Sequence, residues 1–179
     1  MIYVFLAMGF EEIEALAVVD ILRRAELDVV TVGIGGRTIR GCHGIIVAAD
    51  IEDSQATAHG LEAIVLPGGM PGTLNLEHSP VVQHLLDSAV ERDLWICAIC
   101  AAPSILGHRG LLDGRTAVCF PGYEQELTGA TVTDTAVAVD GHYITACGAG
   151  EALSFGLRIV SEMVSPERAA MLKASMQCR

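Results

Sequence analysis

The sequence lacks any apolar run long enough to cross a membrane. None of its uninterrupted apolar stretches approaches the roughly 18 to 20 residues that a spanning helix needs. At the amino end, Met1 leads directly into the apolar segment 2–6, without the basic residues or the cleavage site of a secretory signal. The sequence therefore predicts a cytoplasmic protein with no membrane partner.

Positive charge is also scarce. The chain has 11 Lys and Arg residues against 22 Asp and Glu residues, which gives a formal net charge of -11. Such a chain repels a phosphate backbone unless basic residues cluster locally. The densest basic pair is Arg23-Arg24. Nucleic acid is therefore not expected as a stable partner.

Aromatic residues make up 4% of a chain that is 51% hydrophobic, so the core must consist mostly of Ala, Val, Ile and Leu. A chain of 179 residues can bury such a core without disulfides or a structural metal. No linker, repeat or low-complexity segment is present, and we expect one domain over residues 1–179. The six cysteines are scattered, and without a secretory signal they are expected to be free thiols.

What the chain does contain is an alternation of short apolar runs with helical patterns, which is typical of an α/β fold with a mainly parallel sheet. The predicted strands are 2–6, 28–33, 63–66, 94–98 and about 116–118. The predicted helices are 11–25, 80–92 after Ser79 as N-cap, 101–108, 150–164 and 166–176. Two hairpins are expected, one over 37–48 and one with Asp140-Gly141 as its two-residue turn.

The stretch LWICAICAAPSIL places Cys97 and Cys100 at the spacing of a redox dithiol or half a metal site. Metal is not expected, because a zinc site needs about four ligands and neither a second C-x-x-C nor a paired His is present. If a strand ends here and a helix begins at once, Cys100 lies at a sharp turn of the nucleophile-elbow type. Helix-end N–H groups favour a thiolate and can hold an oxyanion. The alternative is that both cysteines are buried in the core, which we favour for Cys97.

Glu14 is the second candidate. On a helix starting at residue 11, the apolar residues Ala17, Val18 and Ile21 lie three, four and seven positions after Glu14. The Glu14 carboxyl therefore lies on an apolar face. Burial raises the pKa of a carboxyl, so a protonated Glu14 could donate to a thiolate or act as general acid and base. A partly exposed glutamate at the edge of that face is the alternative. Glu11 and Glu12 are interpreted as first-turn acids favoured by the helix dipole.

The third candidate is Pro67-Gly68-Gly69, which follows a buried strand. A glycine pair there lets backbone N–H groups face an oxyanion, although a plain turn has the same composition. The segment lacks the spacing and the Lys-Ser/Thr of a phosphate loop. None of the six histidines is an obvious base for Cys100, which argues against a cysteine peptidase.

These features occur in order along the chain. Segments 7–14, 65–69, 98–103 and 119–124 read AMGFEEIE, VLPGG, AICAAP and CFPGYE. Together they resemble the ThiJ/PfpI superfamily, most closely the branch of the parkinsonism-associated protein deglycase and its bacterial relatives. The resemblance implies a flavodoxin-like three-layer sandwich that forms homodimers. It implies Cys100 as nucleophile, Glu14 as its protonated partner, and Gly68, Gly69 and Ala101 as the oxyanion and substrate site.

Members of this branch are described as glyoxalases that need no cofactor and as deglycases of early glycation adducts. The resemblance therefore implies a small aldehyde, methylglyoxal or glyoxal, or a glycated substrate. Cys100 would add to the aldehyde, Gly69 and Ala101 would hold the oxyanion, and Glu14 would shuttle protons before water releases the acid. Oxidative or carbonyl stress is the expected setting.

Two departures from the family pattern stand out. Phe120 occupies a position where some relatives have histidine. Ala146-Cys147-Gly148 replaces the start of a Ser-Arg-Gly-Pro-Gly loop, which removes an arginine and adds a thiol. We expect Cys147 to be buried and inert, and the alternative is a regulatory disulfide with Cys100 or Cys119.

Two functions of other classes remain open at this stage. A redox sensor or holdase chaperone needs only an acidic thiol and a glutamate that can bind its oxidised form. An intracellular peptidase or amidotransferase is disfavoured, because Ala101 follows Cys100 where those branches have a histidine, and no His-x-Glu occurs later.

Overall fold

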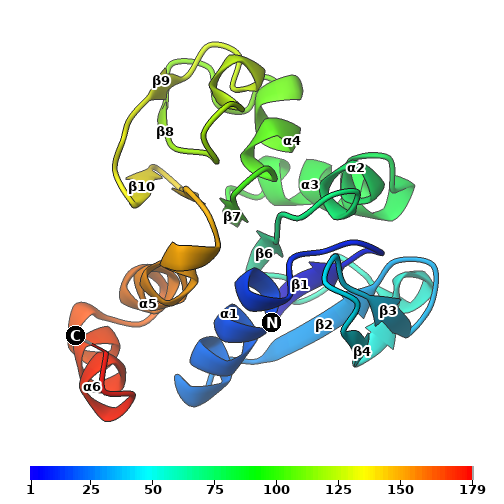
Figure 1. The fold of residues 1–179 in the computed structure, drawn as a ribbon, viewed down its shortest axis with the longest axis horizontal. Helices are drawn as coiled ribbons and strands as arrows, with labels where there is room; N and C mark the ends of the chain where they lie inside the picture. Colours follow the sequence, from blue (N-terminus) through cyan, green and yellow to red (C-terminus); the bar gives the residue numbers. More distant parts are fainter. Residues whose placement is uncertain (179) are drawn as a thin grey trace.

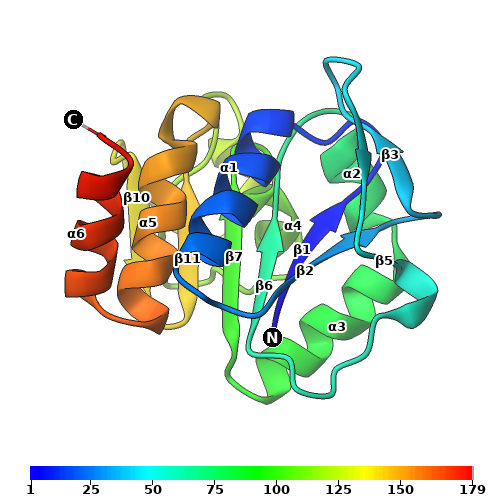
Figure 2. The same cartoon turned by 90° about the horizontal axis from the view of Figure 1, so that it is seen from below.

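A seven-stranded sheet forms the middle layer of the molecule (Figure 2). The computed structural model describes residues 1–178. Neighbouring strands are parallel except β10 and β11, which pair antiparallel. The mainly parallel α/β sheet predicted from the sequence is confirmed. In order across the sheet, the strands are β10 (Val137–Asp140), β11 (Tyr143–Ala146), β7 (Trp95–Ile99), β6 (Ala63–Leu66), β1 (Ile2–Leu6), β2 (Val29–Gly33) and β5 (Ile51–Glu52).

Helices cover both faces of this sheet (Figure 1). On one face lie α1 (Glu12–Arg24) and α5 (Ala152–Met163), with α6 (Pro166–Ser175) against α5; on the other lie α2 (Gly72–Glu77), α3 (Pro80–Glu91) and α4 (Pro103–His108). Alternation along β1 shows the division: Val4 joins the core under α1 and α5, whereas Phe5 joins the core under α3 and α4. This is the flavodoxin-like sandwich expected from the sequence.

Local signals explain several helix starts. The Ser79 side chain accepts from Val82 N at 3.4 Å, and Pro80 occupies the first helical position of α3. Ser165 and Pro166 begin α6 in the same way. In the described part of the chain, every helix is too short or too polar for a membrane span.

Some boundaries and elements differ from the sequence prediction. The helix expected from 101 begins at Pro103, because residues 100–102 form the turn after β7. Helix α2 was not predicted, since it begins directly after the Gly- and Pro-rich segment 67–71. The first hairpin is confirmed as β3 (Thr38–Arg40) and β4 (Ile46–Ala48). The strand expected at about 116–118 is confirmed as β8 (Thr116–Ala117). Short elements that were not predicted are β9 (Thr131–Val132) and the 3-10 turns η1 (Asp53–Gln55), η2 (Glu124–Glu126) and η3 (Ala149–Glu151).

The second hairpin has a different turn from the one expected. Asp140 is the last residue of β10 and pairs with Tyr143, so the two turn residues are Gly141 and His142. Gly141 has a φ of 57°, and glycine is the residue favoured at a first turn position of positive φ. The prediction of Asp140-Gly141 as the turn was therefore wrong by one residue.

The strand order places a topological switch point beside β1. This strand lies between β2 and β6. The strands that follow it in sequence are added first on one side of it, as β2 and β5, and then on the other side, from β6 to β10. In open parallel sheets, ligands bind beyond the carboxyl ends of the strands at such a point. The segments that leave β1, β6 and β7 at this edge are 7–11, 67–71 and 100–102. Segment 7–11 leads into α1, which carries Glu14, so the three candidates named from the sequence lie at the same edge.

Candidate active site

Cys100 occupies the turn between β7 and α4. Its φ is 65°, a left-handed conformation that is costly for a residue with a side chain, by about 1–3 kcal/mol. Hydrogen bonds hold it there: Cys100 N donates to Ala146 O at 2.9 Å, and Phe120 N donates to Cys100 O at 2.8 Å. The structure thus has the elbow geometry predicted at this cysteine.

Two backbone N–H groups face the Cys100 sulfur, those of Gly69 and Ala101. Gly69 has a φ of 88°, and a Cβ atom there would lie 2.4 Å from Glu11 N, so the position requires glycine. The two donors come from different strand ends, β6 and β7. The structure therefore brings together the two groups for which the sequence predicted an oxyanion-binding role.

Glu14 rises from the first turn of α1 into the same space and is 1% exposed. Its Oε2 accepts from Gly68 N at 2.8 Å, and its Oε1 is buried without a hydrogen-bond partner. A Cβ atom on Gly68 would lie 2.7 Å from Cys100 Cβ and 2.8 Å from Glu14 Oε2. The partly exposed alternative for Glu14 is excluded.

The position of Gly68 corrects one expectation. The family resemblance implies Gly68 as part of the oxyanion and substrate site, but its N–H is already bonded to Glu14. Its carbonyl oxygen accepts from Glu11 N at 2.9 Å. Gly68 therefore positions the carboxyl group, and the N–H groups directed at the sulfur are those of Gly69 and Ala101.

The carboxyl and the thiol compete for one proton. Burial raises the pKa of Glu14 to about 7, with a contribution from the charge of Glu11, although the Cys100 thiol and Gly68 N–H act in the opposite direction. Burial and the Glu14 carboxylate raise the pKa of Cys100 to about 12, against the lowering effect of the Ala101 and Gly69 N–H groups. The N–H groups thus favour the thiolate, as expected from the sequence, whereas burial and the Glu14 carboxylate oppose it. Protonation of Glu14 removes the carboxylate charge that opposes the thiolate.

A small cavity opens above the sulfur, with a volume of about 170 Å³. Its lining consists of Gly69, Met70, Cys100, Ala101, Phe120 and Tyr123. Sites for drug-sized ligands usually measure about 300–1,000 Å³, so this cavity fits a much smaller molecule. Phe120 lies at the cavity as expected, and none of these lining residues is a histidine. Met70 and Tyr123 carry no chemical signature in the sequence, so their place in the lining is not predictable from it.

The other cysteines lie apart from this cavity. Cys97 is fully buried in the core beneath α1 and α5, as expected. Cys147 is half-buried, so the expectation of a buried residue was wrong; it lies in a second cavity of about 490 Å³ that Cys119 also lines. Among the described residues all six cysteines are free thiols. The regulatory disulfide considered for Cys147 is not formed in this structure.

Glu11 and Glu12 also differ from expectation. Both are buried, and both contact the hairpin turn at Cys42 and His43. The sequence interpretation as simple first-turn acids was incomplete, because this contact joins residues about 30 positions apart. The hydrophobic patterns of strands and helices reflect neighbouring residues only, so they could not predict this long-range contact.

The fold and the site together define a class: flavodoxin-like α/β proteins with a cysteine at a strand-to-helix elbow beside a buried glutamate. The chain belongs to the DJ-1/PfpI family, whose model matches residues 1–162. The Parkinson disease protein 7 homolog of Danio rerio is 34% identical, over 97% of this chain and 94% of that protein.

Two further similarities bear on the site. The glutathione-independent glyoxalase DJR-1.2 of Caenorhabditis elegans is 31% identical, over 88% of this chain and 85% of that protein. The solved structure of oxidized Toxoplasma gondii DJ-1 superposes with a TM-score of 0.94 at 30% identity, covering 98% of this chain and 97% of that one.

The buried Glu14 should make stability depend on pH. Its pKa is about 7 in the folded chain against 4.5 for an ordinary glutamate, so ionisation opposes folding increasingly as the pH rises through this range. Glu14→Gln removes the ionisation. As the pH rises from 4.5 to about 8, the parent should lose up to about 3 kcal/mol of unfolding free energy that the variant keeps. Urea denaturation at both pH values measures the difference.

The matched control is Glu91→Gln, at an exposed position on α3. Its effect should stay within about 0.5 kcal/mol at both pH values. An identical pH dependence for Glu14→Gln and the parent would contradict the raised pKa.

Proposed function

We propose that this protein is a cysteine-dependent glyoxalase that converts methylglyoxal or glyoxal to the hydroxy acid without a cofactor, and that it acts as a deglycase on early glycation adducts. One observation carries the proposal: the Cys100 sulfur faces two backbone N–H groups, adjoins the buried Glu14, and lies at a cavity of about 170 Å³. An aldehyde of two or three carbons is of the size that such a cavity admits.

In the first step, the Cys100 sulfur attacks the aldehyde carbon while Glu14 holds the proton that the pair shares. The carbonyl electron pair moves to oxygen. The Gly69 and Ala101 N–H groups, which face the sulfur, lie where they can stabilise this oxyanion. Glu14 then gives its proton to this oxyanion, which completes the hemithioacetal and leaves Glu14 as a carboxylate.

In the second step, Glu14 takes the proton from the former aldehyde carbon and returns it to the neighbouring carbon through an enediol. Its buried Oε1 has no hydrogen-bond partner, so this oxygen is available for the transfer. The product is a hydroxyacyl thioester of Cys100. Water cleaves the thioester to the hydroxy acid and the free thiol, so the net reaction adds one water and needs no oxidant.

Two further observations support this proposal. A relative at 31% identity carries the name glutathione-independent glyoxalase. A substrate that isomerises internally needs no histidine base, and none lines the cavity.

We also propose a cytoplasmic location, since the cysteines described are free thiols.

Cys100→Ser should abolish the conversion of methylglyoxal to lactate, measured as lactate formed without glutathione or added metal. Loss of a nucleophile typically costs at least about 1,000-fold in turnover. Cys178→Ser, which alters a thiol at the far end of the chain, should keep the parent rate. Full turnover by Cys100→Ser would exclude the mechanism, and absence of lactate from the parent protein would exclude the activity.

We propose redox sensing through Cys100 as a second function. Unlike the fully buried Cys97, Cys100 reaches a cavity, and a protonated Glu14 beside it can donate to an oxygen on the sulfur. The related Toxoplasma gondii structure is of an oxidized protein.

Peroxide titration followed by peptide mass spectrometry should show Cys100 gaining two oxygens before the other cysteines. Glu14→Ala should slow or divert this product, because the sulfinate loses its hydrogen-bond donor. Oxidation of Cys42 or Cys147 while Cys100 stays reduced would contradict a sensing role.

We also propose that the chain forms a homodimer through α1 and the neighbouring hairpin. Ile13 and Leu16 lie three residues apart on one face of α1, and Ile45 and Ile46 follow the hairpin turn; all four are exposed. Ile45 N donates to the Glu12 carboxylate, which holds the hairpin against the start of α1. Exposed apolar side chains grouped in this way are typical of a protein interface.

Ile46→Asp should convert the dimer to a monomer, because it places a charge within an apolar interface. Sedimentation velocity would measure the mass in solution. Met171→Asp, on the exposed side of α6, is the control and should leave the assembly unchanged. A monomeric parent protein would rule out this interface.

A further inference from the structure

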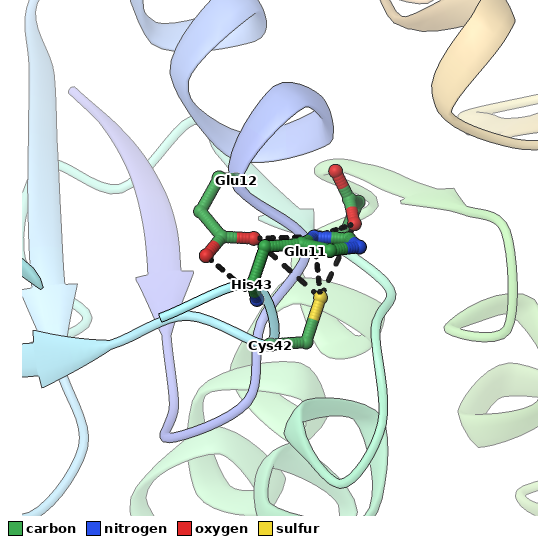
Figure 3. A group of neighbouring side chains, drawn as sticks. All are labelled: Glu11, Glu12, Cys42 and His43. Carbon is green, nitrogen blue, oxygen red and sulfur yellow. Dashed lines mark hydrogen bonds and ion pairs between the residues drawn. The ribbon is translucent and has the colours of Figure 1, made fainter. Parts of the chain in front are cut away.

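The start of α1 and the turn of the β3–β4 hairpin bring together four side chains that commonly bind metals (Figure 3). They are Glu11, Glu12, Cys42 and His43, each of which offers one ligand atom, and these atoms lie within 4.8 Å of one another. We propose that this cluster is a binding site for a divalent cation of the zinc class, separate from the Cys100 site.

The distances within the cluster fit one tetrahedral ion. His43 Nδ1 lies 3.1 Å from Glu11 Oε2 and 3.0 Å from Glu12 Oε2. Cys42 Sγ lies 3.2 Å from His43 Nδ1, 3.2 Å from Glu11 Oε2 and 3.5 Å from Glu12 Oε2. Zinc bonds of about 2.0–2.1 Å to oxygen and nitrogen and 2.3 Å to sulfur imply tetrahedral edges of roughly 3.3–3.6 Å. Five of the six separations therefore lie within a few tenths of an ångström of these edges, and the two carboxylate oxygens lie within 4.8 Å of each other.

Both carboxylates are held in place by their other oxygen. Glu11 Oε1 accepts from Ile13 N at 3.1 Å, and Glu12 Oε1 accepts from His43 N at 2.9 Å and from Ile45 N at 3.2 Å. The two Oε2 atoms are thereby directed at the cysteine and the histidine (Figure 3). Such outer hydrogen bonds orient the ligands of a metal site.

Gly41 makes room for the Glu12 carboxyl. A Cβ atom at this position would lie 2.3 Å from both Cδ and Oε1 of Glu12. Any larger residue would displace the carboxyl from beneath the hairpin. The hairpin is thus shaped to receive this side chain as well as to present Cys42 and His43.

The charge of the cluster also calls for a cation. Glu11 and Glu12 are 8% and 4% exposed, and in residues 1–178 their only ion-pair partner is His43. Burying adjacent carboxylates is costly unless positive charge compensates them. Histidine supplies at most one charge, whereas a divalent ion supplies two.

The ligand types select the ion. Thiolate and imidazole suit zinc and its neighbours, whereas calcium and magnesium prefer all-oxygen sites. Binding replaces the proton on Cys42 Sγ, and any proton on His43 Nδ1, with bonds to the metal; no group is oxidised or reduced. In the single chain, Cys42 and His43 are exposed, so an ion can reach the site from solvent before the hairpin enters the proposed dimer interface.

The test is titration of the purified full-length protein, freed of metal by a chelator, with Co²⁺ and then Zn²⁺. We expect one Co²⁺ per chain, with a sulfur-to-cobalt charge-transfer band and the intense visible bands of a tetrahedral site. Zn²⁺ should displace the cobalt and raise the melting temperature, because an ion that binds only the folded chain stabilises it.

Cys42→Ser and His43→Ala should each weaken Zn²⁺ binding by at least about 10- to 100-fold. That is the loss usually seen when a residue that only orients a metal ligand is removed. Cys42→Ser should also remove the charge-transfer band. Cys178→Ser and His59→Ala alter a thiol and an exposed imidazole elsewhere and should bind as the parent does. Because the His43 side chain is 70% exposed, His43→Ala tests the site even if Cys42→Ser folds poorly.

Two results would overturn the proposal. If the protein takes up no cobalt and melts at the same temperature with and without zinc, the cluster is only an ion pair of His43 with the two glutamates. If the cobalt spectrum survives Cys42→Ser and disappears in Cys100→Ser, the ion binds at the elbow. Neither result depends on glyoxalase activity, which is measured without added metal.

Discussion

A pair of hydrogen bonds at Gly68 supports the whole arrangement at the carboxyl edge of the sheet. Gly68 N donates to the Glu14 carboxylate, and Gly68 O accepts from the backbone N–H of Glu11. The first turn of α1 is thereby fixed against the end of β6. A side chain on residue 68 would collide with both Cys100 and Glu14. The absence of a side chain at this one position therefore lets helix, loop and nucleophile approach one another.

The same close packing determines the electrostatics. Glu14 is deprived of water, so its neutral form is favoured, and the Cys100 thiol adjoins it. The charges of the carboxylate and the thiolate oppose each other, and the N–H groups of Gly69 and Ala101 favour the thiolate. A carboxyl that can be protonated, next to a thiol whose ionisation its charge opposes, suits chemistry in which a proton must leave and return.

Much of this could be predicted from the sequence because its signals are local. Buried strands, the Ser79-Pro80 helix start and the turn after Cys97 all follow from neighbouring residues. Predictions failed where distant segments determine the outcome. The bond between Gly68 and Glu14, and the burial of Glu12 beneath the hairpin, depend on tertiary packing. The partial exposure of Cys147 likewise depends on the loops around it, which no periodicity describes.

The order of strands in the sheet has a consequence for how the protein matures. The segments that surround Cys100 leave β1, β6 and β7, which are distant in sequence and adjacent only once the parallel strands have paired. Parallel pairing of this kind is non-local and forms slowly compared with helices and hairpins. During synthesis and refolding, Cys100 is therefore an ordinary thiol. Its special surroundings require β1, β6 and β7 to be paired, so reactivity at this one sulfur depends on formation of the sheet.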